Sequence, residues 1–199
     1  MAGRAPHPHR GDRPGLDGAC FAVVAARFNE RISKRLLSGA MRALASGGVT
    51  DEAVEVHWVP GSFELPQAAA LLARTGRYAA IVCVGCVIKG ETPHFDFVAG
   101  QAAAGIQQVA LATGVPATFG VITALTEAQA LARSGGEVGN RGQEAAEAAL
   151  EMAAFVHAQR SRNGGGGSGG GGPRRRRAQA GSGPDRRGGG APRSRPGGK

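Results

Sequence analysis

The stretch Cys83-Val-Gly-Cys-Val-Ile-Lys-Gly-Glu-Thr-Pro-His-Phe-Asp-Phe97 predicts how this chain folds. It completes an apolar run from Tyr78 to Ile88, which has the length and composition of a strand buried on both faces. Thr92 and Pro93 then predict the start of a helix, with threonine as the N-cap and proline in the first turn. A strand, a short loop and a helix therefore follow one another directly.

This junction is a candidate ligand site. The carboxyl end of a parallel strand that leads into a helix is where open α/β sheets bind ligands, and the free N–H groups there suit an anion. His94 falls in the first helical turn. Imidazole is the side chain best suited to move a proton near pH 7. Position alone leaves two alternatives for His94, a functional residue and a solvated one.

Strands and helices alternate along the rest of the chain. Apolar runs predict four strands, at residues 20–26, 54–59, 78–88 and 117–123. Helical spacing of apolar residues predicts helices at about 30–45, 65–75, 94–113, 126–132 and 143–159. This alternation predicts an α/β fold, a three-layer α/β/α sandwich with a four-stranded parallel flavodoxin-like sheet. We expect a domain at 18–160, a flexible N-terminal arm at 1–17 and a disordered Gly/Arg-rich basic tail at 161–199.

Positive charge is concentrated in the tail. Residues 160–199 contain eleven Arg or Lys and one acid, whereas residues 1–159 contain thirteen basic and fourteen acidic residues. The overall charge of +9 therefore does not indicate a basic face on the folded domain. The run Arg174–Arg177 fits a solvated tail or a non-specific, salt-sensitive partner of nucleic acid. The Gly164–Gly172 run fits an engineered linker as well as a natural extension.

The three cysteines do not form a disulfide framework, which favours a reducing compartment. There is no apolar run of membrane length, so we expect a cytoplasmic protein without a membrane partner. Cys83 and Cys86 match C-x-x-C, but residues three apart on a strand point to opposite faces, so we expect core packing. No metal-ligand spacing or phosphate-loop motif occurs, so we expect no metal and no nucleotide cofactor.

Aromatic side chains occur in two polar loops that follow strands. Phe28 and Phe63 are either lids over the core or stacking surfaces for a flat ligand. Both loops are predicted at the same sheet edge as His94, which favours the ligand alternative. Arg133 and Arg141 flank a glycine-rich loop, where they are either surface charge or phosphate partners.

Five motifs together resemble one family closely. They are Ala26-Arg-Phe-Asn29, Trp58-Val-Pro-Gly-Ser-Phe-Glu-Leu-Pro66, Gly85-Cys-Val-Ile-Lys-Gly-Glu-Thr-Pro-His-Phe-Asp-Phe-Val98, Thr113-Gly-Val-Pro116 with Phe119-Gly120, and Ala132-Arg-Ser-Gly-Gly-Glu-Val-Gly-Asn-Arg-Gly142. Over about residues 18–157 the chain resembles 6,7-dimethyl-8-ribityllumazine synthase. The resemblance implies that residues 18–160 form a lumazine synthase domain.

The resemblance implies an enzyme of the penultimate step of riboflavin synthesis. It would condense 5-amino-6-(D-ribitylamino)uracil with 3,4-dihydroxy-2-butanone 4-phosphate through a Schiff base, phosphate loss and ring closure. The family uses no cofactor or metal. Much of the catalysis would come from positioning the two reactants. The alternative is a shell or scaffold of the same fold whose basic tails bind nucleic acid or acidic cargo.

The resemblance also implies the role of each site residue. His94 would transfer protons, Phe28 would stack on the pyrimidine, and Arg133 would pair with the phosphate. The other implied binding residues are Ser62, Phe63 and Glu64 for the ribityl chain and ring, Cys86, Val87 and Ile88 for the uracil edge, Glu91 and Thr92 for the phosphate, and Phe119.

Lys89 and Arg141 depart from the family pattern, since arginine is common at the first position and lysine at the second. Phe119 and Arg133 are expected from a neighbouring subunit. The implied assembly is a homopentamer, and the short loop at 135–142 resembles that of members with a 60-subunit shell. Riboflavin synthase is an implied candidate partner.

Overall fold

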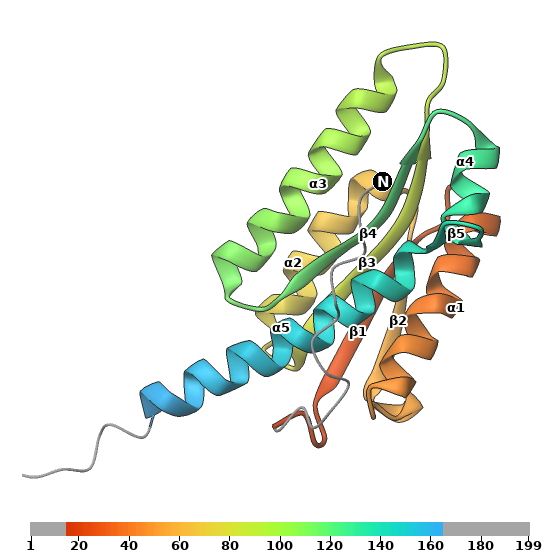
Figure 1. The fold of residues 1–199 in the computed structure, drawn as a ribbon. Coiled ribbons are helices and arrows are strands. Elements are labelled where there is room, and N and C mark those ends of the chain that lie inside the picture. Colours follow the sequence, from red (N-terminus) through yellow and green to blue (C-terminus); the bar gives the residue numbers. More distant parts are fainter. Residues whose placement is uncertain (1–14, 165–199) are drawn as a thin grey trace, which may run out of the picture. The chain divides into compact units, whose positions relative to one another are not determined.

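Four parallel strands form the central sheet of the chain, in the order β2-β1-β3-β4 (Figure 1). The computed structural model describes residues 15–164. The elements are β1 (Cys20–Ala26), α1 (Glu30–Ser46), β2 (Val54–Val59), α2 (Leu65–Arg74), β3 (Tyr78–Ile88), α3 (His94–Thr113), β4 (Ala117–Ala124), α4 (Glu127–Ala132), β5 (Ser134–Gly136), β6 (Gly139–Asn140) and α5 (Arg141–Gly164). Most of the predicted arm and tail lies outside the described residues.

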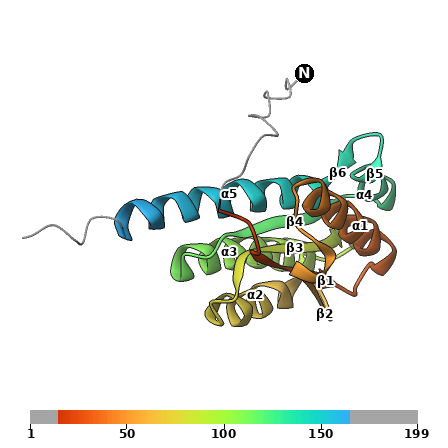
Figure 2. The ribbon, with the colours of Figure 1, turned by 90° about the horizontal axis from the view of Figure 1, so that it is seen from below.

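The sheet separates two hydrophobic cores, which confirms the three-layer prediction. One face packs against α1 and α5, and the other packs against α2 and α3 (Figure 2). Neighbouring residues of a strand contribute to different cores, as with Val23 and Val24 of β1. Because both faces are covered, β1 and β3 read as continuous apolar runs.

The two cysteines of the C-x-x-C pattern point to opposite faces of β3, as predicted. Cys83 lies in the core under α2 and α3, whereas Cys86 lies in the core under α1 and α5. Both are free thiols, and burial raises the pKa of each to about 12. They fill space in the two cores.

Strand order gives the sheet a switch point between β1 and β3, and we call the space between the loops that follow β1, β2 and β3 at its carboxyl edge the crevice. From β1 the chain crosses to β2 on one side, and from β2 it returns to β3 on the other side of β1. β1 and β3 are neighbours, and the loops that follow them lead to helices on opposite faces of the sheet. Open α/β sheets bind ligands between two such loops. The stretch quoted from the sequence forms one wall of this crevice.

Three details differ from the sequence-based expectations. Thr92 is not the N-cap of α3, because Pro93 takes the cap position with helical dihedral angles and no side chain caps the helix. The predicted loop at 134–142 contains the short hairpin β5–β6. The last helix begins at Arg141 and continues to Gly164, so it is longer than predicted at both ends.

The junction of β6 and α5 packs tightly on α1. The Asn140 side chain is buried; its Oδ1 accepts hydrogen bonds from the Gly142 and Gln143 N–H groups (2.9 and 3.1 Å), and its Nδ2 donates to the Arg35 carbonyl (3.0 Å). Asn140 therefore caps α5 and ties it to α1. A Cβ at Gly142 would lie 2.1 Å from the Leu36 carbonyl oxygen, so glycine is required there. Among the described helices, none is long and apolar enough to span a membrane.

Candidate active site

Three loops meet at the carboxyl edge of the sheet, after β1, β2 and β3. The first two are joined through their backbones. Arg27 donates its N–H to the Val59 carbonyl (2.8 Å), and Phe28 donates its N–H to the Pro60 carbonyl (3.0 Å). The β1 loop is therefore fixed against the end of β2.

The aromatic side chains of these loops project away from the core. Phe28 is 72% exposed and Phe63 is 55% exposed. Neither covers a core, so the lid alternative is wrong for both. Exposed phenylalanine rings beside a crevice are suited to stacking on a flat ligand.

The β2 loop places a buried hydroxyl beside β3. Ser62, Phe63 and Glu64 form a 3-10 turn that leads directly into α2. Ser62 is buried, and its Oγ has no hydrogen-bond partner among the described residues. A Cβ at Gly85 would lie 2.7 Å from that oxygen, so the hydroxyl lies against the β3 backbone. A buried hydroxyl without a partner is costly unless a ligand or water satisfies it.

The end of β3 is free of β1. The pairing of these two strands ends at Ala25 and Val84, and β3 continues for four more residues, 85–88. On its other side β3 remains paired with β4 to Ile88. One edge of residues 85–88 therefore lines the crevice.

The hydrogen bonds show which peptide groups face the crevice. Lys89 donates its N–H to the Ala124 carbonyl of β4 (2.9 Å). Since backbone groups of successive residues alternate between the two sides of a strand, the peptide groups of Val87 also face β4. Those of Cys86 and Ile88 face the crevice, where they can bind a heterocycle edge.

The β3–α3 loop is exposed and ends at a long helix. Glu91, Thr92 and His94 are all exposed, and His94 is the first residue of α3. The first turn of a helix leaves N–H groups without intrahelical acceptors and carries a positive partial charge. An anion fits there, and an imidazole lies at the same place.

Arg133, Arg141 and Phe119 belong to other parts of the subunit. Arg133 follows α4 and donates through its guanidinium to the Gln129 carbonyl (3.1 Å). Arg141 is the first residue of α5, ion-paired with Glu144. Phe119 is partly exposed on the edge strand β4, about 16 Å along the strand from its carboxyl end. Among the described residues, no hydrogen bond or ion pair joins these three side chains to the crevice loops.

Comparisons with known proteins identify the family. A sequence model described as 6,7-dimethyl-8-ribityllumazine synthase matches residues 18–157. The chain belongs to the 6,7-dimethyl-8-ribityllumazine synthase family. Proteins of that name from Desulfotalea psychrophila, Desulfatibacillum aliphaticivorans and Salinibacter ruber are 49%, 47% and 50% identical to it over 142, 136 and 141 residues. The matches cover 71%, 68% and 71% of this chain and 92%, 88% and 90% of those proteins. Lumazine synthases are transferases of riboflavin biosynthesis.

Two asparagines at this edge of the sheet were not predicted. Asn29 has a left-handed backbone and donates its side-chain Nδ2 to the Cys86 carbonyl (3.0 Å). Asn140 caps α5, as described above. The sequence carries a signal for Asn140, because asparagine before a helix is a frequent cap. For Asn29 the partner is 57 residues away, and local sequence does not reveal it.

Proposed function

We propose that the chain condenses 5-amino-6-(D-ribitylamino)uracil with 3,4-dihydroxy-2-butanone 4-phosphate to form 6,7-dimethyl-8-ribityllumazine. The observation that carries this proposal is the match over residues 18–157, which contain the three crevice loops. The uracil amine attacks the ketone and water leaves, giving a Schiff base. Phosphate is then eliminated, and ring closure by the ribitylamino nitrogen releases a second water.

The crevice residues divide between the two substrates. Phe28 stacks on the pyrimidine, while the Cys86 and Ile88 peptide groups bind its edge and Val87 packs beneath it. Ser62, Phe63 and Glu64 hold the ribityl chain and ring. Their place in the turn between β2 and α2, at the same edge of the sheet as Phe28, supports this role.

The phosphate binds at the start of α3. Glu91 and Thr92 contribute backbone N–H groups. His94, the first residue of α3, moves protons between the two reactants. Lys89, in the β3–α3 loop, adds positive charge near the phosphate, and Arg141 adds positive charge there from a neighbouring subunit. Holding both reactants in one crevice supplies much of the rate, because it replaces an encounter in solution.

Arg133 and Phe119 complete the site from a neighbouring subunit. Within the described part of their own subunit, Arg133 is hydrogen-bonded to α4 and Phe119 lies on the edge strand β4, which supports a role in a neighbouring subunit's site. The family's oligomeric assembly brings such subunits together. We propose a homopentamer, and we propose the 60-subunit shell from the short β5–β6 hairpin. The particle mass in solution separates pentamer from shell.

Turnover is the direct test of the proposed function. Purified protein mixed with the two substrates, with chelator present, should form the lumazine chromophore. Folded protein that produces none would refute the assignment. Arg133→Gln is the informative variant, since it should raise the KM of the ketone phosphate more than that of the pyrimidine.

A second candidate function concerns the basic tail. Its net positive charge sits on a chain that is otherwise nearly neutral, which favours non-specific binding of nucleic acid or acidic cargo when many tails act together. RNA retention by the full chain should exceed that of a chain ending at Asn163, and high salt should remove the difference. Equal retention would exclude this function. We propose riboflavin synthase as a partner from the family resemblance, and the cytoplasm as the location from the cysteine usage.

A further inference from the structure

Asn29 bridges the two walls of the crevice. It lies in the β1 loop directly after Phe28, and its Nδ2 donates to the Cys86 carbonyl of β3 (3.0 Å). The Cys86 peptide faces the crevice, so this hydrogen bond lies beside the groups assigned to the pyrimidine. It joins two segments that are 57 residues apart in the chain.

The backbone of Asn29 is unusual for a residue with a side chain. With φ 60° and ψ 43° it is left-handed, and among residues 15–164 it is the one non-glycine residue with a positive φ. Asparagine tolerates this conformation better than most residues with a Cβ. The conformation turns the chain from β1 into α1 and directs the side chain toward β3.

The Asn29 side chain does not cap the helix that follows it. Asn29 occupies the N-cap position of α1, where asparagine ordinarily accepts a hydrogen bond from the first helical turn. Here it makes no capping hydrogen bond. The amide is committed to β3 in place of the helix, so helix capping does not account for the asparagine.

The rest of the β1 loop is held on the opposite side. The Arg27 and Phe28 N–H groups donate to carbonyls at the end of β2, and these bonds do not involve the Asn29 side chain. In the described residues, the Asn29 amide makes the one hydrogen bond from the 27–29 loop to β3, so losing it would loosen the loop on that side while leaving the hydrogen bonds to the end of β2. The width of the crevice between the Phe28 backbone and the β3 edge then depends on Asn29.

We propose that Asn29 is a positioning residue for the pyrimidine substrate. It holds the Phe28 ring at a fixed separation from the Cys86 and Ile88 peptide groups, so that stacking and edge recognition occur together. A carbonyl oxygen has two lone pairs, so Cys86 can still accept a hydrogen bond from the ligand. The inference rests on the proposed function, because it deepens the account of the same site.

Three variants separate the amide from the backbone. Asn29→Gly keeps the left-handed conformation and removes the hydrogen bond. Asn29→Asp keeps the shape but replaces the donor with an oxygen that faces the Cys86 carbonyl. Asn29→Ala removes the amide and adds backbone strain, so it should be the least stable of the three.

The readout is the KM of each substrate in the full-length assembly. Asn29→Gly and Asn29→Asp should raise the KM of the pyrimidine about fivefold to tenfold, the effect of one lost hydrogen bond. The KM of the ketone phosphate should change by less than about twofold, since the start of α3 is not attached to Asn29. A merely structural role would move both values together.

Calorimetric titration with the pyrimidine alone distinguishes this proposal from the proposed function. Weaker binding by Asn29→Gly than by the wild type supports the positioning role, even if turnover is absent and the reaction assignment fails. Equal pyrimidine binding by the two proteins would overturn the positioning role. So would an equal rise in both KM values, or a wild type that binds no pyrimidine.

Discussion

At the scale of single residues, alternation along β3 divides structural from functional groups. Cys83 and Cys86 place their side chains in the two cores, whereas the Cys86 and Ile88 peptide groups face the crevice. In the proposed site, Cys86 therefore packs its thiol in the core and presents its peptide groups to the substrate. This explains how a residue assigned to substrate binding can be almost completely buried.

His94→Ala should slow turnover by about 100-fold or less. General acid–base catalysis by one side chain typically contributes at least this factor, and the effect is smaller here when groups of the substrates share the proton transfers. The measurement is the rate at saturating concentrations of both substrates. His157→Ala, on the exposed face of α5, is a matched control and should keep the wild-type rate. An unchanged rate in His94→Ala would remove this histidine from the mechanism.

The two core thiols should be unreactive in the folded protein. Burial raises the pKa of Cys83 and Cys86 to about 12, so neither forms a thiolate at pH 8, and neither is accessible. In Cys20→Ser, a thiol reagent should therefore react only after unfolding in denaturant. Rapid reaction of the folded variant would show that one of the cores is open.

At the scale of elements, the strands could be predicted closely and the loops could not. β1, β2 and β3 have the predicted bounds. β1 and β3 are apolar runs covered on both faces, which have clear ends, and the edge strand β2 alternates with a period of two before Pro60-Gly61. The loops were placed at the correct edge by topology alone. The exposure of Phe28, the tie from Asn140 to α1 and the bridge from Asn29 depend on how distant segments pack, which periodicity does not contain.

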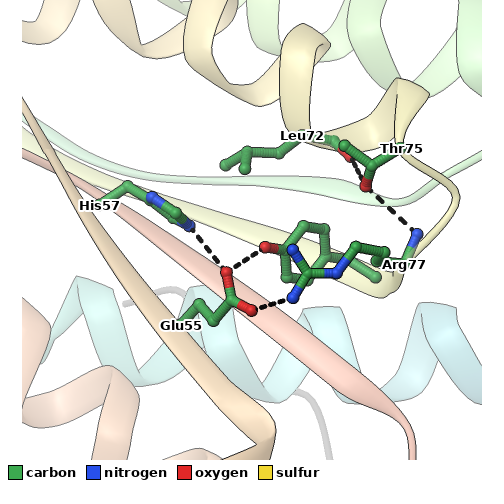
Figure 3. A network of polar contacts seen from close by, with 6 residues as sticks. Glu55, His57, Leu72, Thr75 and Arg77 are labelled. Carbon is green, nitrogen blue, oxygen red and sulfur yellow. Dashed lines mark hydrogen bonds and ion pairs between the residues drawn. The ribbon is translucent and has the colours of Figure 1, made fainter.

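A polar network joins β2 and β3 near the amino edge of the sheet (Figure 3). Glu55 accepts hydrogen bonds from Arg77 and from the Tyr78 hydroxyl, and His57 Nε2 lies 3.4 Å from its Oε2. The Tyr78 hydrogen bond lowers the pKa of Glu55, and burial raises the pKa of Tyr78. The network links the edge strand β2 to the start of β3, with β1 between them. It lies at the end of the sheet away from the crevice.

Glu55→Gln should destabilise the protein in a pH-dependent way. The pKa of the Glu55 carboxyl is lower in the folded state than in the unfolded state. Its contribution to the free energy of unfolding is therefore present above the ordinary carboxyl pKa, and it is lost as the pH falls through the lowered pKa. Denaturant unfolding at fixed subunit concentration should show a difference from the wild type at pH 7 that shrinks at pH 3. Glu151→Gln, an exposed change on α5, is the control. A pH-independent difference would contradict this account.

At the scale of the whole molecule, α3 indicates an assembly. From Phe97 to Thr113 the helix has no charged residue, yet Phe97 is 68% exposed and Leu111 is 79% exposed. Three glutamines are the polar side chains on the exposed side of this segment, and a helix side with large apolar residues and no charge is normally covered. In a family that forms oligomers, this face of α3 fits a subunit contact.

A charge on that face should break the assembly. Ala104→Glu places a carboxylate on the exposed side of α3, whereas Ala45→Glu places the same change on the exposed side of α1. The first should lower the particle mass measured by light scattering, because burying an unpaired charge at an interface is costly. The second should leave the mass unchanged. If both proteins keep the wild-type mass, α3 is not the contact.

The most direct test of the central claim, a lumazine synthase site completed by a neighbouring subunit, mixes two impaired variants at substrate concentrations below the wild-type KM values. Phe28→Ala lacks the stacking ring and Arg133→Gln lacks the phosphate partner. After unfolding and refolding as an equal mixture, about a quarter of the interfaces in a cyclic assembly pair an intact ring with an intact arginine. The account predicts lumazine formation at about a quarter of the wild-type rate. Activity no higher than that of the separate variants would contradict it.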